Sequence, residues 1–306
     1  MSDVTLHLGD CLDFMRALPD GSVDAVVTDP PYGLTFMGKD WDRGVPGVAF
    51  WREALRVAKP GAMLLAMGGT RTFHRLVCAI EDAGFEIRDT IAWLYGSGFP
   101  KSYDISKGID KKAGAEREVV GVHPNPATPK SGTFNCSFDK SKAVITAPAT
   151  EAAQLWHGWG TALKPAMELI CVAMKPIDGT FVNNALTWGV AGLWIDGGRV
   201  KTDEVLGRIC TPQSPTSYSL HDKREWVDNS AGKGRFPANV IHDGSDEVTG
   251  LFPMTKSGIA VRHNSGGNTF GGSKPKPQME DMTYGDSGSA ARFFYCAKSS
   301  RSERNG

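Results

Sequence analysis

Short apolar runs alternate with helical stripes over the first hundred residues, and this alternation restricts the chain to an α/β fold. Val23–Thr28 and Ala62–Met67 each have the length and composition of a buried strand. Between them comes a helical stripe made by Phe50, Ala54, Leu55 and Val57, followed by Pro60-Gly61, which we expect to separate helix and strand. The pattern predicts a βαβ unit with two parallel strands.

The alternation continues beyond this unit. Phe73, Leu76, Val77 and Ile80 recur at helical spacing and predict a helix that ends near Gly84. Residues 85–94 and 168–174 have the composition of two further strands, the second stopped by Lys175-Pro176. We expect a mixed, mainly parallel sheet with an antiparallel strand at its edge.

Two long stretches, 112–150 and 201–292, are rich in Gly, Pro, Ser, Asn and Lys and show little periodicity. We interpret them as insertions outside the core. The glycine-rich residues 265–273 follow no predicted strand and open no apolar helix, so they predict a loop and not a phosphate-binding turn.

Charge and cysteine usage limit the classes of function. Lys plus Arg and Asp plus Glu are both 34, so any nucleic-acid surface must be a local patch. The densest basic stretch consists of Lys101, Lys107, Lys111, Lys112 and Arg117. The six cysteines show no metal-ligand spacing, and the chain has neither a signal-peptide pattern nor a long apolar run. We expect a cytoplasmic, soluble protein without bound metal.

Asp29-Pro30-Pro31-Tyr32 directly follows the strand predicted at 23–28. Ligands of open α/β sheets bind beyond the carboxyl ends of the strands, so a ligand is expected here. The exocyclic amine of adenine or cytosine is a poor nucleophile because its lone pair is delocalised into the ring. Two acceptors on its N–H bonds favour a pyramidal nitrogen, and the Asp29 carboxylate and the Pro30 carbonyl suit that role.

The other two residues of the tetrapeptide support this interpretation. Pro31 restricts Pro30 to extended geometry, which orients the Pro30 carbonyl. Tyr32 offers a flat face for stacking a base that has been swung out of the duplex. The alternative is that the tetrapeptide only forms a turn at the end of a strand.

Nearly the whole chain resembles the permuted, beta-group N-6/N-4 DNA amino-methyltransferases of phages and restriction-modification systems. The matching segments are Leu6–Leu12, Asp29–Tyr32, Gly33–Asp42, Ile91–Lys101, Thr161–Glu168, Gly234–Asn239 and Arg292–Tyr295. The resemblance implies a Rossmann-like methyltransferase fold that uses S-adenosylmethionine and double-stranded DNA. Because Asp stands first in the tetrapeptide, it further implies methylation of adenine N6. Cytosine N4, a non-catalytic or split DNA-binding half, and a protein glutamine amide are the alternatives.

The resemblance also assigns residues. It implies catalytic roles for Asp29, Pro30, Pro31 and Tyr32, and a strand at Leu6–Leu8 leading to cofactor contacts by Asp10, Cys11 and Asp29. It places at the base pocket or on DNA Phe36, Lys39, Trp41, Phe99, Lys101 and Lys164.

The resemblance suggests a division into a catalytic core (1–111), an insertion (112–160), a return to the core (161–200), a target-recognition region (201–292) and a tail (293–306). The family's His-Pro-Thr-x-Lys-Pro and Asp-Pro-Phe-x-Gly-Ser-Gly segments do not occur. We therefore expect a fold that is incomplete at its C-terminal end, with exposed apolar edges. A longer chain, a second chain or a homodimer would then complete the cofactor site, unless the chain is an inactive relative.

Overall fold

The computed structural model describes residues 4–34, 40–98, 102–122, 144–202, 208–210, 226–228, 232–256 and 287–297. The chain divides into two compact units. The first comprises Met1–Gly96 and Met167–Gly306, and the second is Ser97–Ala166. The second unit begins earlier and ends later than the insertion expected at 112–160.

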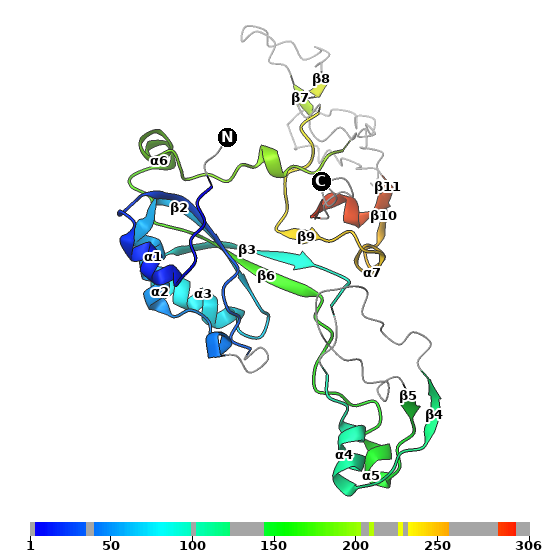
Figure 1. Cartoon of the computed structure of the whole chain (residues 1–306). Helices are drawn as coiled ribbons and strands as arrows, with labels where there is room; N and C mark the ends of the chain where they lie inside the picture. The colour runs from blue at the N-terminus through cyan, green and yellow to red at the C-terminus, as the bar shows by residue number, and fades with distance from the viewer. Residues whose placement is uncertain are drawn as a thin grey trace, which may run out of the picture. The chain divides into compact units, whose positions relative to one another are not determined.

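A six-stranded sheet organises the first unit (Figure 1). Its strands, in spatial order, are β1 (Val23–Thr28), β2 (Ala58–Gly68), β6 (Met167–Met174), β3 (Glu86–Leu94), β9 (Val240–His242) and β12 (Tyr295–Cys296). β1 pairs parallel with β2, and β3, β9 and β12 pair parallel with one another, whereas β6 runs antiparallel to both of its neighbours. The predicted mixed, mainly parallel α/β sheet is confirmed.

The position predicted for the antiparallel strand was wrong, because β6 lies at the centre of the sheet and not at its edge. Its last four residues, Cys171 to Met174, are all buried. A strand with a continuous apolar run buries both of its faces, and only an interior position provides that cover.

The interpretation of residues 201–292 as lying wholly outside the core was also wrong. β9 falls within that stretch and continues the main sheet, with Ala92 opposite Val240 and Leu94 opposite His242. Three-residue strands carry too little periodicity to be recognised in a polar sequence. β9 nevertheless supplies the backbone hydrogen bonds that the outer side of β3 needs.

Three helices cover one face of this sheet: α1 (Cys11–Ala17), α2 (Val48–Val57) and α3 (Phe73–Asp82) (Figure 1). Trp51 and Ala54 of α2 and Leu76 and Ile80 of α3 pack in one core cluster with residues of β2 and β6. The predicted helices at 50–57 and 73–80 are thus confirmed. Their apolar stripes form because residues three and four positions apart share a face.

The boundary between α2 and β2 differs from the prediction. The helix ends at Val57 and the strand begins at Ala58, so Pro60-Gly61 lie inside β2. The register between β1 and β2 changes there, since Val23 pairs with Ala58 but Ala25 pairs with Met63. A bulge in the strand accommodates the proline and glycine.

The strand expected at Leu6–Leu8 is not formed, and both leucines are exposed. Among the described strands of the main sheet, β1 occupies an edge, and its Val27 side chain is 67% exposed. Among the described residues, 4–10, which precede α1, pair with no strand of the sheet. The expected exposure of apolar side chains at a sheet edge is observed at β1.

Smaller elements complete the first unit. They are η2 (Asp40–Asp42), α6 (Phe181–Trp188), η4 (Asp196–Gly198), β7 (Arg208–Cys210), β8 (Trp226–Asp228), α7 (Asp246–Thr249), β10 (Met254–Lys256), β11 (Ser287–Ser289) and η5 (Ala290–Phe293). Buried Asn184 attaches α6 to β2, because its side-chain amide donates to the Pro60 carbonyl at 2.6 Å. No helix of the described residues is long and apolar enough to cross a membrane.

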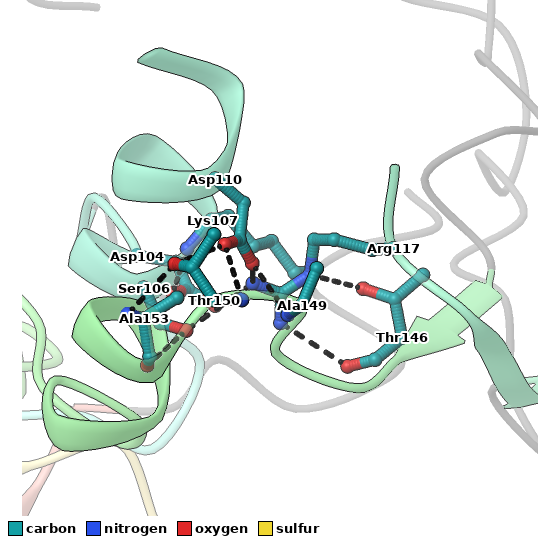
Figure 2. Close-up of polar contacts among 9 residues, drawn as sticks. All are labelled: Asp104, Ser106, Lys107, Asp110, Arg117, Thr146, Ala149, Thr150 and Ala153. Atoms are coloured by element: carbon teal, nitrogen blue, oxygen red, sulfur yellow. Dashed lines mark hydrogen bonds and ion pairs between the residues drawn. The ribbon is translucent and has the colours of Figure 1, made fainter. Parts of the chain in front are cut away.

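The second unit contains α4 (Ile105–Ala113), β4 (Val119–Val122), β5 (Val144–Thr146) and α5 (Glu151–Leu155). Its centre is the fully buried carboxylate of Asp110 (Figure 2). Arg117 Nη1 donates to this carboxylate at 2.6 Å, as do the backbone N–H of Ala149 at 3.0 Å and the hydroxyl of Thr150 at 2.7 Å. The network joins α4 to the segment that enters α5.

The electrostatics of this network favour an ionised Asp110. Burial opposes ionisation, but the hydrogen bonds from Ala149 and Thr150 and the charge of Arg117 outweigh it and lower the pKa of Asp110. Arg117, which belongs to the densest basic stretch of the sequence, is held inside the unit, with its side chain 11% exposed. The Asp110 network is structural.

Candidate active site

The tetrapeptide Asp29-Pro30-Pro31-Tyr32 lies at the carboxyl end of β1, as predicted from the strand that precedes it. Thr28, the last residue of β1, pairs with Ala66 near the carboxyl end of β2. Asp29 is exposed, whereas Pro30 is buried. The carboxylate thus faces solvent at the edge of the sheet, while the proline fixes the backbone beneath it.

Tyr32 is held from two sides. Its backbone carbonyl accepts a hydrogen bond from the Thr72 hydroxyl at 2.5 Å. Its ring lies against Gly69, where an added Cβ would come within 3.0 Å of the Tyr32 ring. A side chain at position 69 would therefore require the Tyr32 ring to shift slightly.

The phenol of Tyr32 lies within hydrogen-bonding reach of the Asp29 carboxylate. Burial, this hydrogen bond and the nearby charge of Glu168 raise the pKa of Tyr32. The phenol therefore keeps its proton at neutral pH and acts as a hydrogen-bond donor to Asp29. The hydrogen bond uses the phenol oxygen, so the face of the Tyr32 ring remains the surface that the sequence suggested for base stacking.

Asp42 fixes the chain that leaves the tetrapeptide. It is 2% exposed, and its carboxylate accepts hydrogen bonds from the backbone N–H groups of Gly33 at 2.7 Å and Leu34 at 3.2 Å. Gly33 has φ +67° and packs against the backbone of Gly44, so a side chain at position 33 would be strained. Sequence reasoning missed this role of Asp42; the available signal was a carboxylate placed after a glycine turn.

Glu168 and Tyr95 also belong to this site, and sequence reasoning did not assign them to it. Glu168 is opposite Trp93 of β3, and the Trp93 and Tyr95 rings are 5.6 Å apart. Because β6 runs antiparallel, its beginning lies at the same edge as the carboxyl ends of β2 and β3. Burial raises the pKa of Glu168, and the negative charge of Asp29 adds to the increase.

The residues expected at the cofactor have a local structural role. Asp10 is the N-cap of α1, and its carboxylate accepts a hydrogen bond from the backbone N–H of Leu12 at 2.7 Å. Cys11 is an exposed free cysteine at the start of that helix. Their contacts with a cofactor remain a prediction.

The residues predicted for the base pocket are placed only in part. Phe36, Lys39, Phe99 and Lys101 lie outside the described residues, as does the side chain of Trp41. Lys164 is exposed and belongs to the second unit, whereas Asp29 and Tyr32 belong to the first. Within the described ranges, no group of His, Cys, Asp and Glu side chains is arranged to hold a metal ion.

Comparisons with known proteins bear on this site. No family model matches the chain. It is 31% identical over 87 residues to "Putative methylase YubD" of Escherichia coli K12, covering 26% of this chain and 37% of the relative. It is 37% identical over 70 residues to the type II methyltransferase M.BamHI of Bacillus amyloliquefaciens, covering 19% of this chain and 16% of the relative.

Two solved structures align more broadly but weakly. TTHA0409 of Thermus thermophilus, a "Putative DNA Modification Methylase", gives a TM-score of 0.28 at 18% identity and covers 57% of this chain and 55% of that one. The PvuII DNA methyltransferase (cytosine-N4-specific) gives 0.29 at 13% identity over 60% of this chain and 62% of that one. At these TM-scores the alignments do not establish a common fold. Over about a quarter of its length, the chain is similar in sequence to methylases.

Proposed function

We propose that this chain is the catalytic part of a DNA methyltransferase that transfers a methyl group from S-adenosylmethionine to the N6 amine of adenine. The observation that carries the proposal is the exposed Asp29 carboxylate at the carboxyl end of β1, next to half-buried Tyr32. The sequence similarity to methylases supports it. A Rossmann-like methyltransferase architecture is part of the same proposal, since the sheet is mixed and helix-covered.

In this proposal, two acceptors hold the amine. The Asp29 carboxylate accepts one N–H, and the Pro30 carbonyl, to which no described residue donates a hydrogen bond, accepts the other. Pro31 restricts Pro30 to extended geometry, so the orientation of the Pro30 carbonyl is set before the base arrives. Thr72 holds the Tyr32 carbonyl, which leaves the Tyr32 ring to pack against the base.

The charges at the site suit a cationic methyl donor. Asp29 and Glu168 are close enough for their charges to interact, and no positively charged group contributes to the pKa changes there. When bound, S-adenosylmethionine supplies an electrophilic methyl group on a positively charged sulfur. Asp10 and Cys11 are the residues that we propose to contact its adenosine part.

Cytosine N4 is the second candidate substrate. Its amine has the same delocalised lone pair and the same two N–H bonds as that of adenine, so Asp29 and Pro30 would hold it in the same way. Incubation of the chain with DNA and S-adenosylmethionine labelled in the methyl group, followed by separation of the nucleosides, distinguishes the two. Label on cytosine alone would contradict the assignment to adenine.

Replacement of Asp29 tests the mechanism. We expect Asp29→Ala to slow methyl transfer on the order of 10- to 100-fold or more, because a charge-assisted hydrogen bond to the amine is lost. Asp24→Ala is the matched control, since Asp24 lies on the same strand but pairs with Lys59 and is 72% exposed. An Asp29→Ala rate equal to the wild-type rate would show that Asp29 does not hold the amine.

A further inference from the structure

Methylation of an amine requires a proton acceptor, and this inference rests on the function proposed above. The neutral amine has two hydrogens, and the nitrogen that has gained a methyl group carries one proton too many. A group within the site must take that proton, or water must reach the nitrogen. Among the described residues, Tyr32 and Glu168 interact electrostatically with Asp29, and Tyr95 interacts in turn with both of them.

The two phenols are unsuited to accept a proton. Burial raises the pKa of both tyrosines, and the nearby negative charge of Glu168 raises both further. A phenol accepts a proton only after it has lost its own, and a raised pKa prevents that at neutral pH. Tyr32 and Tyr95 therefore remain donors.

Asp29 already has two partners. The Tyr32 phenol donates toward its carboxylate, and the proposed mechanism gives it one N–H of the base. Both contacts engage the Asp29 carboxylate as an acceptor that holds its partners in place. No hydrogen bond from the described residues contributes to the pKa of Glu168.

The register of the sheet places Glu168 at the same edge as Asp29. Leu169 pairs with Gly68 of β2, and Tyr32 packs against the next glycine, Gly69. Alternation along β6 turns Glu168 to the face opposite that of Cys171 and Ala173, which pack with the helices. Glu168 therefore lies beside the strand end that positions Tyr32, on the face opposite the core cluster.

Burial and the charge of Asp29 make Glu168 a stronger base than an ordinary carboxylate. The titratable groups near it are Asp29 and Tyr32 from the end of β1 and Tyr95 from the end of β3, while the end of β2 brings Gly68 and Gly69. Burial raises the pKa of Glu168 first, and the Asp29 charge raises it further. An acceptor works best when its pKa approaches the working pH.

We propose that Glu168 is a second catalytic carboxylate, which takes the proton from the amine nitrogen as that nitrogen is methylated. The nitrogen lone pair forms the bond to the methyl carbon, the bond between carbon and sulfur breaks, and its electron pair stays on the sulfur, which becomes neutral. The proton leaves the nitrogen for a Glu168 carboxylate oxygen. Asp29 holds the amine throughout and keeps its hydrogen bond from the Tyr32 phenol.

Single-turnover methyl transfer across a range of pH tests this role. We expect Glu168→Gln to slow transfer on the order of 100-fold while DNA binding stays at the wild-type level, because general bases contribute about that much. The wild-type rate should rise with pH through one ionisation, and that rise should be absent in Glu168→Gln. Glu168→Asp should restore part of the rate and keep the pH dependence.

Glu86→Gln is the matched control. Glu86 lies at the opposite end of the sheet, where it pairs with Met174, and its side chain is 49% exposed next to Arg88. The Glu86→Gln variant should transfer methyl groups at the wild-type rate. Wild-type pH dependence and rate in Glu168→Gln would overturn the role of Glu168 alone, whereas no transfer by the wild type or by Glu86→Gln would overturn the proposed function as well.

Discussion

Asp110 in the second unit is fully buried and Glu168 in the first is partly buried, and the two carboxylates differ in the charges and hydrogen-bond donors around them. Asp110 receives hydrogen bonds from Ala149 and Thr150 and an ion pair from Arg117, and these lower its pKa. Glu168 faces the like charge of Asp29, and its pKa is raised. The second unit compensates its carboxylate internally, whereas no positively charged group lowers the pKa of Glu168 in the first.

The comparison separates structural from functional acidic residues. A carboxylate whose charge is compensated by its own unit has no capacity left for a substrate, and its loss should affect stability. A carboxylate kept beside another one at a sheet edge destabilises the fold slightly and should affect chemistry. The following substitutions test each side of this comparison.

The largest effect is expected at the structural carboxylate. Asp110→Ala leaves the Arg117 guanidinium buried without its partner, and we expect the unfolding temperature of the second unit to fall by about 10 °C or more. Calorimetry combined with limited proteolysis between 97 and 166 measures it. Asp13→Ala is the control, because its ion pair with Arg16 is exposed and should contribute little. Equal effects of the two substitutions would remove the distinction.

Asp42 is buried and structural, but it also fixes the chain next to Tyr32. We therefore expect its replacement to have an intermediate effect on stability and a further effect on methyl transfer. Asp42→Ala removes two hydrogen bonds to the backbone of Gly33 and Leu34 and should reduce the free energy of unfolding by about 2 kcal/mol. Displacement of Tyr32 should slow methyl transfer on the order of tenfold. Chemical denaturation and the transfer assay measure the two effects. Asp40→Ala, on the same short helix with an exposed partner in Arg43, should change neither.

The smallest effect on stability is expected for a substitution at Glu168. This substitution should stabilise the protein, whereas those at Asp110 and Asp42 should destabilise it. The pKa of Glu168 in the folded state is raised above the ordinary 4.5. Its favourable contribution to the free energy of unfolding is therefore fully present below pH 4.5 and is lost as pH rises through the folded-state pKa. Neutral Glu168→Gln should therefore raise the unfolding temperature at neutral pH by roughly 2 °C and leave it unchanged below pH 4.5. Calorimetry at both pH values measures it. A lower unfolding temperature at neutral pH would contradict the raised pKa.

Local patterns were sufficient to predict the elements that carry the tetrapeptide. The apolar run of β1 and the stripes of α2 and α3 lie within single windows of the sequence, and the structure contains all three. β9 was missed because its position depends on pairing with β3, about 150 residues earlier. Such pairing leaves no local periodicity.

The site was predictable where it is contiguous. Asp29 and Tyr32 are neighbours in the sequence, and a strand before them is enough to place them at a sheet edge. Predicting the position of Glu168 would have required the direction of β6, which a strand pattern does not give. Predicting the role of Asp42 would have required its hydrogen bond with a backbone N–H nine residues away, at Gly33.

The Asp42 carboxylate has a consequence for how such a protein can diversify. It fixes the chain at Gly33 and Leu34, and it stands in η2 just beyond residues 35–39, so both ends of that stretch are attached to one buried group. Exchanging or lengthening residues 35–39 should therefore leave Asp29 in place. Under the proposed function, a new preference for one nucleobase could arise by grafting this short stretch, with no change in the residues that hold the amine.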